Sequence, residues 1–201
     1  ILITVIIGGS FVSGTFYPNV WTVEKIEAEV HKKELNQVKL LGLREPEFEY
    51  TDKTSFLLAT SKCVEYLNYT TDRLSRVPTS IIIAMAGVES GWGTSRFANE
   101  GNALFGVRTW DLKNVAHMKA KGNPDASWGV KKYKTKCQSV HDMIKILNRH
   151  PAYKEFRIER EKQLDSGKWN YRTLMVLMNA WSTNPDYHEI ILQAIVDNKL
   201  P

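Results

Sequence analysis

One glutamate of this sequence stands where a proton donor could form. Glu89 follows Met85 by four residues and Ala86 by three, so a continuous helix would put its carboxyl group on a face with these apolar side chains. Ile82 extends the same face by one more turn. Poor solvation would disfavour the carboxylate and leave an acid able to give up a proton near neutral pH. The competing interpretation is that Glu89 ends the helix in solvent, because glycines follow at positions 91 and 93.

The elements that would position Glu89 are mostly helical. Its own segment begins at Pro78 and is almost wholly apolar, which predicts a buried central helix. Residues 104–136 lack a helical period, and their Gly and Asn content indicates a hairpin or a long loop. The sequence therefore predicts a mainly α domain with a short β-hairpin or loop lobe beside Glu89. The other expected helices span residues 53–68, 94–99, 138–149, 152–165, 170–182 and 185–198.

The N-terminal part differs from this domain in composition. Residues 1–23 carry no charged side chain and are long enough to span a bilayer, as the end of a signal anchor would. Gly, Ser and Pro dilute the apolar character after residue 7, so a processed N-terminus or a segment docked on the domain is the alternative. Residues 24–50 are expected to hold an amphipathic helix and a linker. We place the domain boundary at this linker and expect the helical domain to span 51–201.

Charge is unevenly distributed along the chain. The net charge is +5, and seven lysines share residues 113–136 with a single acid, Asp125. Such a basic surface suits an anionic polymer, although a solvated loop explains it equally well. No recognisable nucleic-acid-binding fold, phosphate loop or nucleophile elbow accompanies it, so nucleic acid is not an expected partner. The histidines at 117, 141 and 150 lack metal-ligand spacing, and no metal or cofactor is expected.

The two cysteines, Cys63 and Cys137, have neither the close spacing of a zinc site nor that of a redox pair. Two free, buried thiols are the preferred interpretation. In an exported protein a disulfide between them would close a long loop and stabilise the fold by about 4 kcal/mol.

Four motifs follow one another along the helical domain. An Ala-rich helix leading to Glu-Ser-Gly-Trp-Gly occupies 84–93, and Asn-Ala-Leu-Phe-Gly occupies 102–106. Ser-Val-His-Asp-Met follows at 139–143, and Trp-Ser-Thr-Asn-Pro-Asp-Tyr at 181–187. In this order they resemble the motifs of the bacterial N-acetylglucosaminidases of glycoside hydrolase family 73, a group that includes flagellar peptidoglycan hydrolases and Bax-like envelope proteins. The matches cover about residues 53–198. The resemblance implies a lysozyme-like helical fold.

The resemblance also implies a function. Glu89 would be the general acid of an endo-β-N-acetylglucosaminidase that cleaves a β-1,4 bond of peptidoglycan glycan strands. The expected location is the bacterial cell envelope, periplasmic or extracellular, with or without an inner-membrane anchor at the N-terminus. A phage protein is the alternative. The rival activities are a lytic transglycosylase and a non-catalytic module that binds peptidoglycan.

The family often carries a second catalytic glutamate in the hairpin, and this sequence departs from that pattern. Gly129 occupies the corresponding position, and the nearest carboxylates are Asp111 and Asp125. Three interpretations stay open. One of these aspartates activates a water in an inverting reaction, the 2-acetamido group of the substrate attacks the anomeric carbon, or catalysis has been lost and glycan binding kept.

Several other side chains are candidates for binding sugar rings or acetamido groups. For the aromatic ones the alternative is core packing, and for Asn102 it is the capping of a turn. Trp181 and Tyr187 are favoured because they lie in the last motif, although Trp181 replaces the usual Tyr. The expected substrate-binding residues are Trp92, Asn102, Phe105, Tyr133, Trp181 and Tyr187.

Overall fold

The computed structural model describes residues 42–201 and, before them, positions 22, 25, 26, 29, 30, 32, 33, 36 and 40, which are helical and exposed. Apart from residue 22, the predicted apolar segment 1–23 lies outside the described residues. The chain divides into two compact units, Ile1–Leu43 with Tyr69–Asp72, and Arg44–Asn68 with Arg73–Pro201. Among the described residues, no helix is both long and apolar enough to cross a membrane. The second unit carries Glu89 and the helices that surround it.

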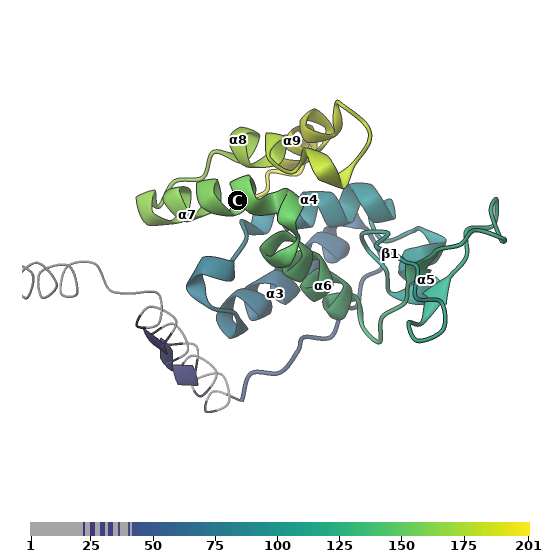
Figure 1. Cartoon of the computed structure of the whole chain (residues 1–201), viewed down its shortest axis with the longest axis horizontal. Coiled ribbons are helices and arrows are strands. Elements are labelled where there is room, and N and C mark those ends of the chain that lie inside the picture. Colours follow the sequence, from purple (N-terminus) through teal and green to yellow (C-terminus); the bar gives the residue numbers. More distant parts are fainter. Residues whose placement is uncertain are drawn as a thin grey trace, which may run out of the picture. The chain divides into compact units, whose positions relative to one another are not determined.

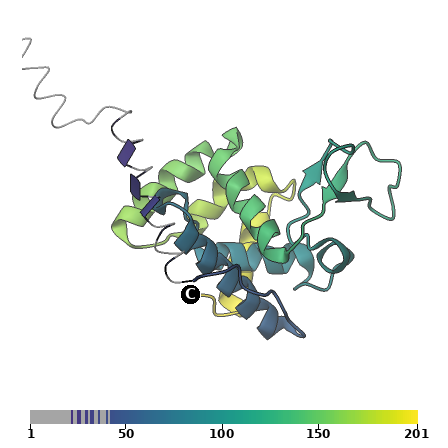
Figure 2. The same ribbon diagram turned by 90° about the horizontal axis from the view of Figure 1, so that it is seen from below.

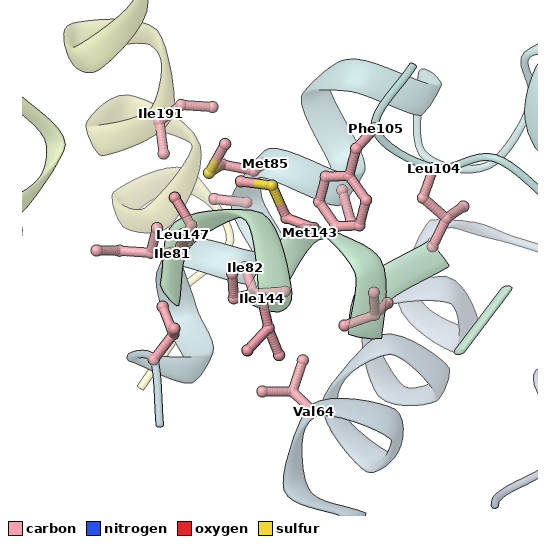
Figure 3. Close-up of a cluster of buried hydrophobic side chains, with 14 of the residues drawn as sticks. Val64, Ile81, Ile82, Met85, Leu104, Phe105, Met143, Ile144, Leu147 and Ile191 are labelled. Atoms are coloured by element: carbon pink, nitrogen blue, oxygen red, sulfur yellow. The ribbon is translucent and has the colours of Figure 1, made fainter. Parts of the chain in front are cut away.

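Helix α4 (Thr79–Ser90) is the central element of this unit. Every residue from Ser80 to Gly87 is buried, because α4 passes through the hydrophobic core of the unit and packs closely against α9 (Tyr187–Asp197). Its neighbours also include α3 (Lys53–Thr70) and α6 (Lys136–Arg149). The predicted central helix is therefore confirmed. Figure 3 shows side chains of α4 among those of its neighbours, with labels on Val64, Ile81, Ile82, Met85, Met143, Ile144, Leu147 and Ile191.

The remaining helices complete the helical body. They are α5 (Arg96–Gly101), α7 (Lys154–Ser166) and α8 (Tyr171–Val176), with short 3-10 turns η1 (Arg73–Ser75), η2 (Pro151–Tyr153) and η3 (Asn179–Trp181). The prediction of one helix over 170–182 is wrong beyond its first half. After α8 the backbone changes to i to i+3 hydrogen bonds, from the amide of Met178 to Met175 and from that of Trp181 to Met178. This tighter path turns the Trp181 side chain toward Glu89.

The segment predicted as a hairpin or loop forms a small antiparallel sheet. Its strands are β1 (Arg108–Thr109), β2 (His117–Met118) and β3 (Gly129–Lys131), in the order β1-β3-β2. Figures 1 and 2 both show this sheet at the end of the helical body where α5 lies. β3 is the central strand, with Arg108 opposite Val130 and His117 opposite Lys131.

Cys63 and Cys137 form a disulfide, so the preference for two free thiols is wrong. The bond joins α3 to the first turn of α6 and lies in the core, with both cysteines buried and their Cα atoms 5.6 Å apart. The 74-residue separation hid this contact from the sequence, since only the packing of the two helices brings the cysteines together.

Residues expected to belong to the linker pack against the helical body. The rings of Phe48 and Tyr50 meet Phe56 of α3 edge to face, at 5.9 and 5.2 Å between centroids. The Tyr50 hydroxyl donates to the carbonyl of Gly93 at 2.8 Å. This extended segment therefore supports the turn that follows Glu89.

Candidate active site

An open groove of about 530 Å³ runs past the C-terminal end of α4. Its floor and walls come from α4, the start of the sheet, α6, η2 and η3. Among the described residues that line it, Glu89 is the only carboxylate and Arg108 the only cation. The lining residues are Glu89, Phe105, Gly106, Val107, Arg108, Trp110, Ile146, Tyr153, Ala180, Trp181, Ser182 and Thr183.

Glu89 is held at this groove by two hydrogen bonds to one of its oxygens. Its Oε1 accepts from Trp181 Nε1 at 3.0 Å and from the Tyr187 hydroxyl at 2.7 Å. The expectation that Glu89 shares the burial of Met85 and Ala86 is wrong, because its side chain is exposed. The reason is that Glu89 lies in the last turn of α4, which ends at Ser90, and this end of the helix borders the open groove. A solvated carboxyl in an open groove can be reached by a polymer.

Tyr187 is buried at the start of α9. Burial raises the pKa of its hydroxyl, and the negative charge of Glu89 and the hydrogen bond to it raise that pKa further. Tyr187 therefore keeps its proton and remains a donor to Glu89. Trp181 reaches the same oxygen from η3, with its ring edge-on to that of Phe105 at 6.5 Å. The structure thus brings together four of the predicted site residues, Glu89, Phe105, Trp181 and Tyr187.

The turn after Glu89 explains why the motif contains Ser, Gly and Trp. Ser90 is buried, and its Oγ donates to the carbonyl of Ala86 at 2.6 Å and accepts from the Gly93 amide at 2.8 Å. Gly91 and Gly93 have φ values of 60° and 85°, which side chains rarely permit. The hydrogen bonds of Ser90 and the positive φ values of the two glycines therefore end helix α4 one residue after Glu89.

Trp92 lies outside the groove that holds Glu89. Its ring covers Gly87, where an added Cβ would come within 2.3 Å of the indole, and Lys53 Nζ lies 4.0 Å from the ring centroid. It borders a separate depression beside α9. Trp92 is thus placed to pack against the C-terminal end of α4, and not to contact a substrate bound in the groove.

Asn102 and Tyr133 are also outside the groove, and both are occupied in joining elements. Asn102 ends α5 with φ 52° and donates to the carbonyls of Tyr133 and Lys134 at 3.1 and 3.0 Å. The Tyr133 hydroxyl donates to Asp142 Oδ2 at 2.8 Å. Lys131 Nζ reaches the same carboxylate oxygen at 2.8 Å.

The two candidate second acids do not line the groove. Asp111 accepts hydrogen bonds from the amide and the side chain of Asn114 at 3.0 and 3.1 Å, which holds a surface turn. Asp125 is exposed in the loop between β2 and β3. Gly129 faces His117 across the sheet, and a Cβ there would lie 2.6 Å from the imidazole Cδ2. Neither aspartate is therefore placed beside Glu89 in the groove.

Sequence reasoning missed several lining residues in and after the short strands. Arg108 and Trp110 come from the segment predicted only as a hairpin or loop, and Tyr153 from η2. Trp110 is 65% exposed, which is unusually high for so large an apolar ring. The signal available in the sequence was the position of Arg108 and Trp110 directly after the Leu-Phe-Gly motif.

In sequence, the chain is similar to one protein family and to two named proteins. The family model of the glucosaminidases, described as mannosyl-glycoprotein endo-beta-N-acetylglucosaminidase, matches residues 69–200. The chain is 30% identical over 132 residues to protein Bax of Escherichia coli K12, covering 64% of this chain and 45% of Bax. It is 29% identical over 126 residues to the exo-glucosaminidase LytG of Bacillus subtilis 168, covering 59% of this chain and 43% of LytG. The chain thus spans less than half the length of these two relatives.

Among solved structures, the catalytic domain of the autolysin Auto from Listeria monocytogenes is similar in fold. The TM-score is 0.55 at 18% sequence identity, and the match covers 83% of this chain and 94% of that one. The predicted mainly α, lysozyme-like fold with a small β lobe is confirmed.

Proposed function

This chain belongs to the glucosaminidase family, and on that premise we propose that it hydrolyses a β-1,4 bond of peptidoglycan glycan strands after an N-acetylglucosamine residue. Glu89 acts as the general acid. The observation that carries the proposal is that the carboxyl group of Glu89 lies in an open groove, where Trp181 and Tyr187 both donate hydrogen bonds to its Oε1. Of the two relatives, LytG is named as an exo-glucosaminidase. The family model is described as an endo-acting enzyme.

The two donors at Oε1 orient the carboxyl group of Glu89 in the groove. They fix the plane of the carboxyl group and leave Oε2 as the oxygen that carries the transferable proton. Orientation of this kind contributes to catalysis because the proton must lie within hydrogen-bond reach of the glycosidic oxygen.

For the other half of the reaction we propose that the substrate supplies the nucleophile. Glu89 is the only carboxylate among the described residues that line the groove, which favours the substrate-assisted route over a water activated by Asp111 or Asp125. The carbonyl oxygen of the 2-acetamido group bonds to the anomeric carbon while the bond to the bridging oxygen breaks. That oxygen takes the proton of Glu89 and leaves as an alcohol. Water then attacks the anomeric carbon, its proton passes to Glu89, and the acetamido group is restored.

The disulfide supports a location in the cell envelope or outside the cell. Bonds of this kind form and persist in oxidising compartments, and Cys63–Cys137 is built into the core of the domain. The proposed partner is accordingly peptidoglycan, and anchoring through residues 1–23 stays a prediction.

Product analysis tests the activity. Purified sacculi digested with the protein should release fragments with a reducing N-acetylglucosamine end, identified by mass spectrometry after borohydride reduction. Anhydro-sugar products would instead identify a lytic transglycosylase. Cosedimentation with sacculi without released fragments would identify a binding module.

The route is tested separately. The substrate-assisted route predicts that the anomeric configuration is retained and that a thiazoline mimic of the cyclised intermediate binds as an inhibitor. Asp111→Asn and Asp125→Asn should each keep most of the rate. A loss on the order of 10²-fold in either variant would assign that aspartate as the base and overturn the route.

A further inference from the structure

Arg108 brings a positive charge to the groove. It is exposed on β1, and it is the only positively charged residue among the described residues that line the groove. Within the described part of the chain it forms no ion pair, whereas Arg73, Arg96 and Arg172 each pair with a carboxylate. An unpaired guanidinium of this kind is free to bind an anion from outside.

The backbone around Arg108 is held rigidly. Arg108 pairs with Val130 of the central strand, and the Lys131 amide donates to the carbonyl of Val107 at 2.8 Å. Thr109, the next residue, is buried, so the alternation of a strand directs Arg108 to the open face.

The guanidinium is also held by stacking. Its central carbon lies 4.1 Å from the centroid of the Trp128 ring, which comes just before β3. Stacking on the flat face of the guanidinium leaves its N–H groups, which lie in the plane, available as donors. Such a pre-oriented fork matches the two oxygens of a carboxylate better than a flexible ammonium would.

We propose that Arg108 binds a carboxylate carried by the glycan substrate and so sets how the strand lies in the groove. The inference rests on the proposed function, because a peptidoglycan strand carries such groups on its muramic acid residues. The chemistry is the same for the free lactyl carboxylate of a strand without peptides and for the carboxylates of a stem peptide.

The charge distribution of the groove favours a single orientation of that substrate. Glu89 in its charged form repels a substrate carboxylate, and Arg108 attracts it. A residue without a carboxylate is therefore preferred next to Glu89, while the acidic neighbour lies toward the sheet. This would place N-acetylglucosamine at the acid and an acidic sugar at Arg108.

Binding measurements on the full chain with Glu89→Gln test the assignment without turnover. Three ligands of equal sugar number are compared by calorimetry: a chitin oligosaccharide without carboxylates, a peptidoglycan strand freed of peptides, and the same strand with stem peptides. Adding Arg108→Ala should weaken binding of a carboxylate-bearing ligand by about 5-fold or more and change that of the chitin oligosaccharide by less than about 2-fold. The strand that loses affinity identifies which carboxylate is bound.

Two further variants serve as controls. Lys62→Ala removes one positive charge from an exposed site on α3, outside the groove, and should leave all three affinities unchanged. Arg108→Lys keeps the charge without the planar fork and should recover only part of the loss.

The outcomes separate the ways in which the assignment can fail. An equal loss for charged and neutral ligands would show that Arg108 only shapes the groove, and no loss would show that it makes no contact, so either result overturns the assignment. If the Glu89→Gln parent binds none of the three ligands, the proposed function itself fails and the assignment falls with it.

Discussion

At the scale of single residues, the site depends on convergence from distant parts of the chain. Glu89 meets Trp181 and Tyr187, which lie 92 and 98 residues away in sequence. Their motifs marked these three residues as candidates, but the sequence did not reveal that both donors share one carboxylate oxygen. Asn102 and Tyr133 carry similar polar groups, yet their partners are backbone carbonyls and Asp142. Residue type alone could not distinguish the two situations.

The Tyr187 hydroxyl is expected to position the acid. Tyr187→Phe keeps the buried ring and removes only the donor to Glu89, so kcat should fall about 10-fold with KM little changed. Steady-state kinetics on soluble glycan strands would measure the split. Tyr133→Phe is the matched control, because it loses an equivalent hydrogen bond to Asp142 outside the groove and should keep the rate. Equal rates for Tyr187→Phe and wild type would show that Tyr187 does not position Glu89.

At the scale of elements, the longer helices were predictable from local signals. Helix α4 was recognised by its continuous apolar run after Pro78, and the start of α3 by the capping residues Thr51 and Asp52. The β lobe was predicted only as a hairpin or loop over residues 104–136. Its individual strands were not predictable, since β1 and β2 are two residues long and β3 three, too short to show an alternation. The groove residues that sequence reasoning missed, Arg108 and Trp110, lie in and just after β1 for the same reason.

The packing of the sheet makes a specific prediction about Gly129. A Cβ at Gly129 would lie 2.6 Å from the His117 ring, so Gly129→Ala should lower the free energy of unfolding by about 1–3 kcal/mol. Gly122→Ala is the control in the same lobe, because a Cβ there meets nothing within 4 Å, and it should change the free energy by less than about 0.5 kcal/mol. Urea unfolding would compare the two. Equal stabilities would contradict the close contact with His117.

The same contact bears on the missing second glutamate. A longer side chain at Gly129 would have to displace His117 before it could approach the groove. His117 is itself held by a 2.9 Å hydrogen bond between Nδ1 and the carbonyl of Val115. The packing of His117 therefore leaves no room for a glutamate side chain at position 129. This agrees with the proposal that the substrate supplies the nucleophile.

At the scale of the whole domain, a disulfide ties helices that are distant in sequence. Cys63–Cys137 links α3 to α6 across a loop of 74 residues and lies beside α4 in the core. The chain-entropy account attributes its stabilising effect to the unfolded state, whose freedom it reduces. The mainly α class followed from the local helix signals and the lysozyme-like fold from the family resemblance, whereas this bond depended on tertiary packing and on the compartment.

Removal of the disulfide should be costly. The double variant Cys63→Ala/Cys137→Ala is expected to lose about 4 kcal/mol of unfolding free energy relative to the oxidised protein. Urea unfolding with and without reductant would measure this, and reductant should leave the double variant unchanged. A loss below about 1 kcal/mol would show that the bond adds little to stability.

The central claim is that Glu89 donates the proton that breaks the glycosidic bond. Glu89→Gln preserves the shape of the side chain and leaves an amide oxygen to accept from Trp181 and Tyr187, but it removes the acidic proton. Release of muropeptides from sacculi should fall by at least about 100-fold with an unchanged Tm. Glu65→Gln, an exposed change on α3, should keep full activity. Muropeptide release by Glu89→Gln within a few-fold of wild type would contradict the account.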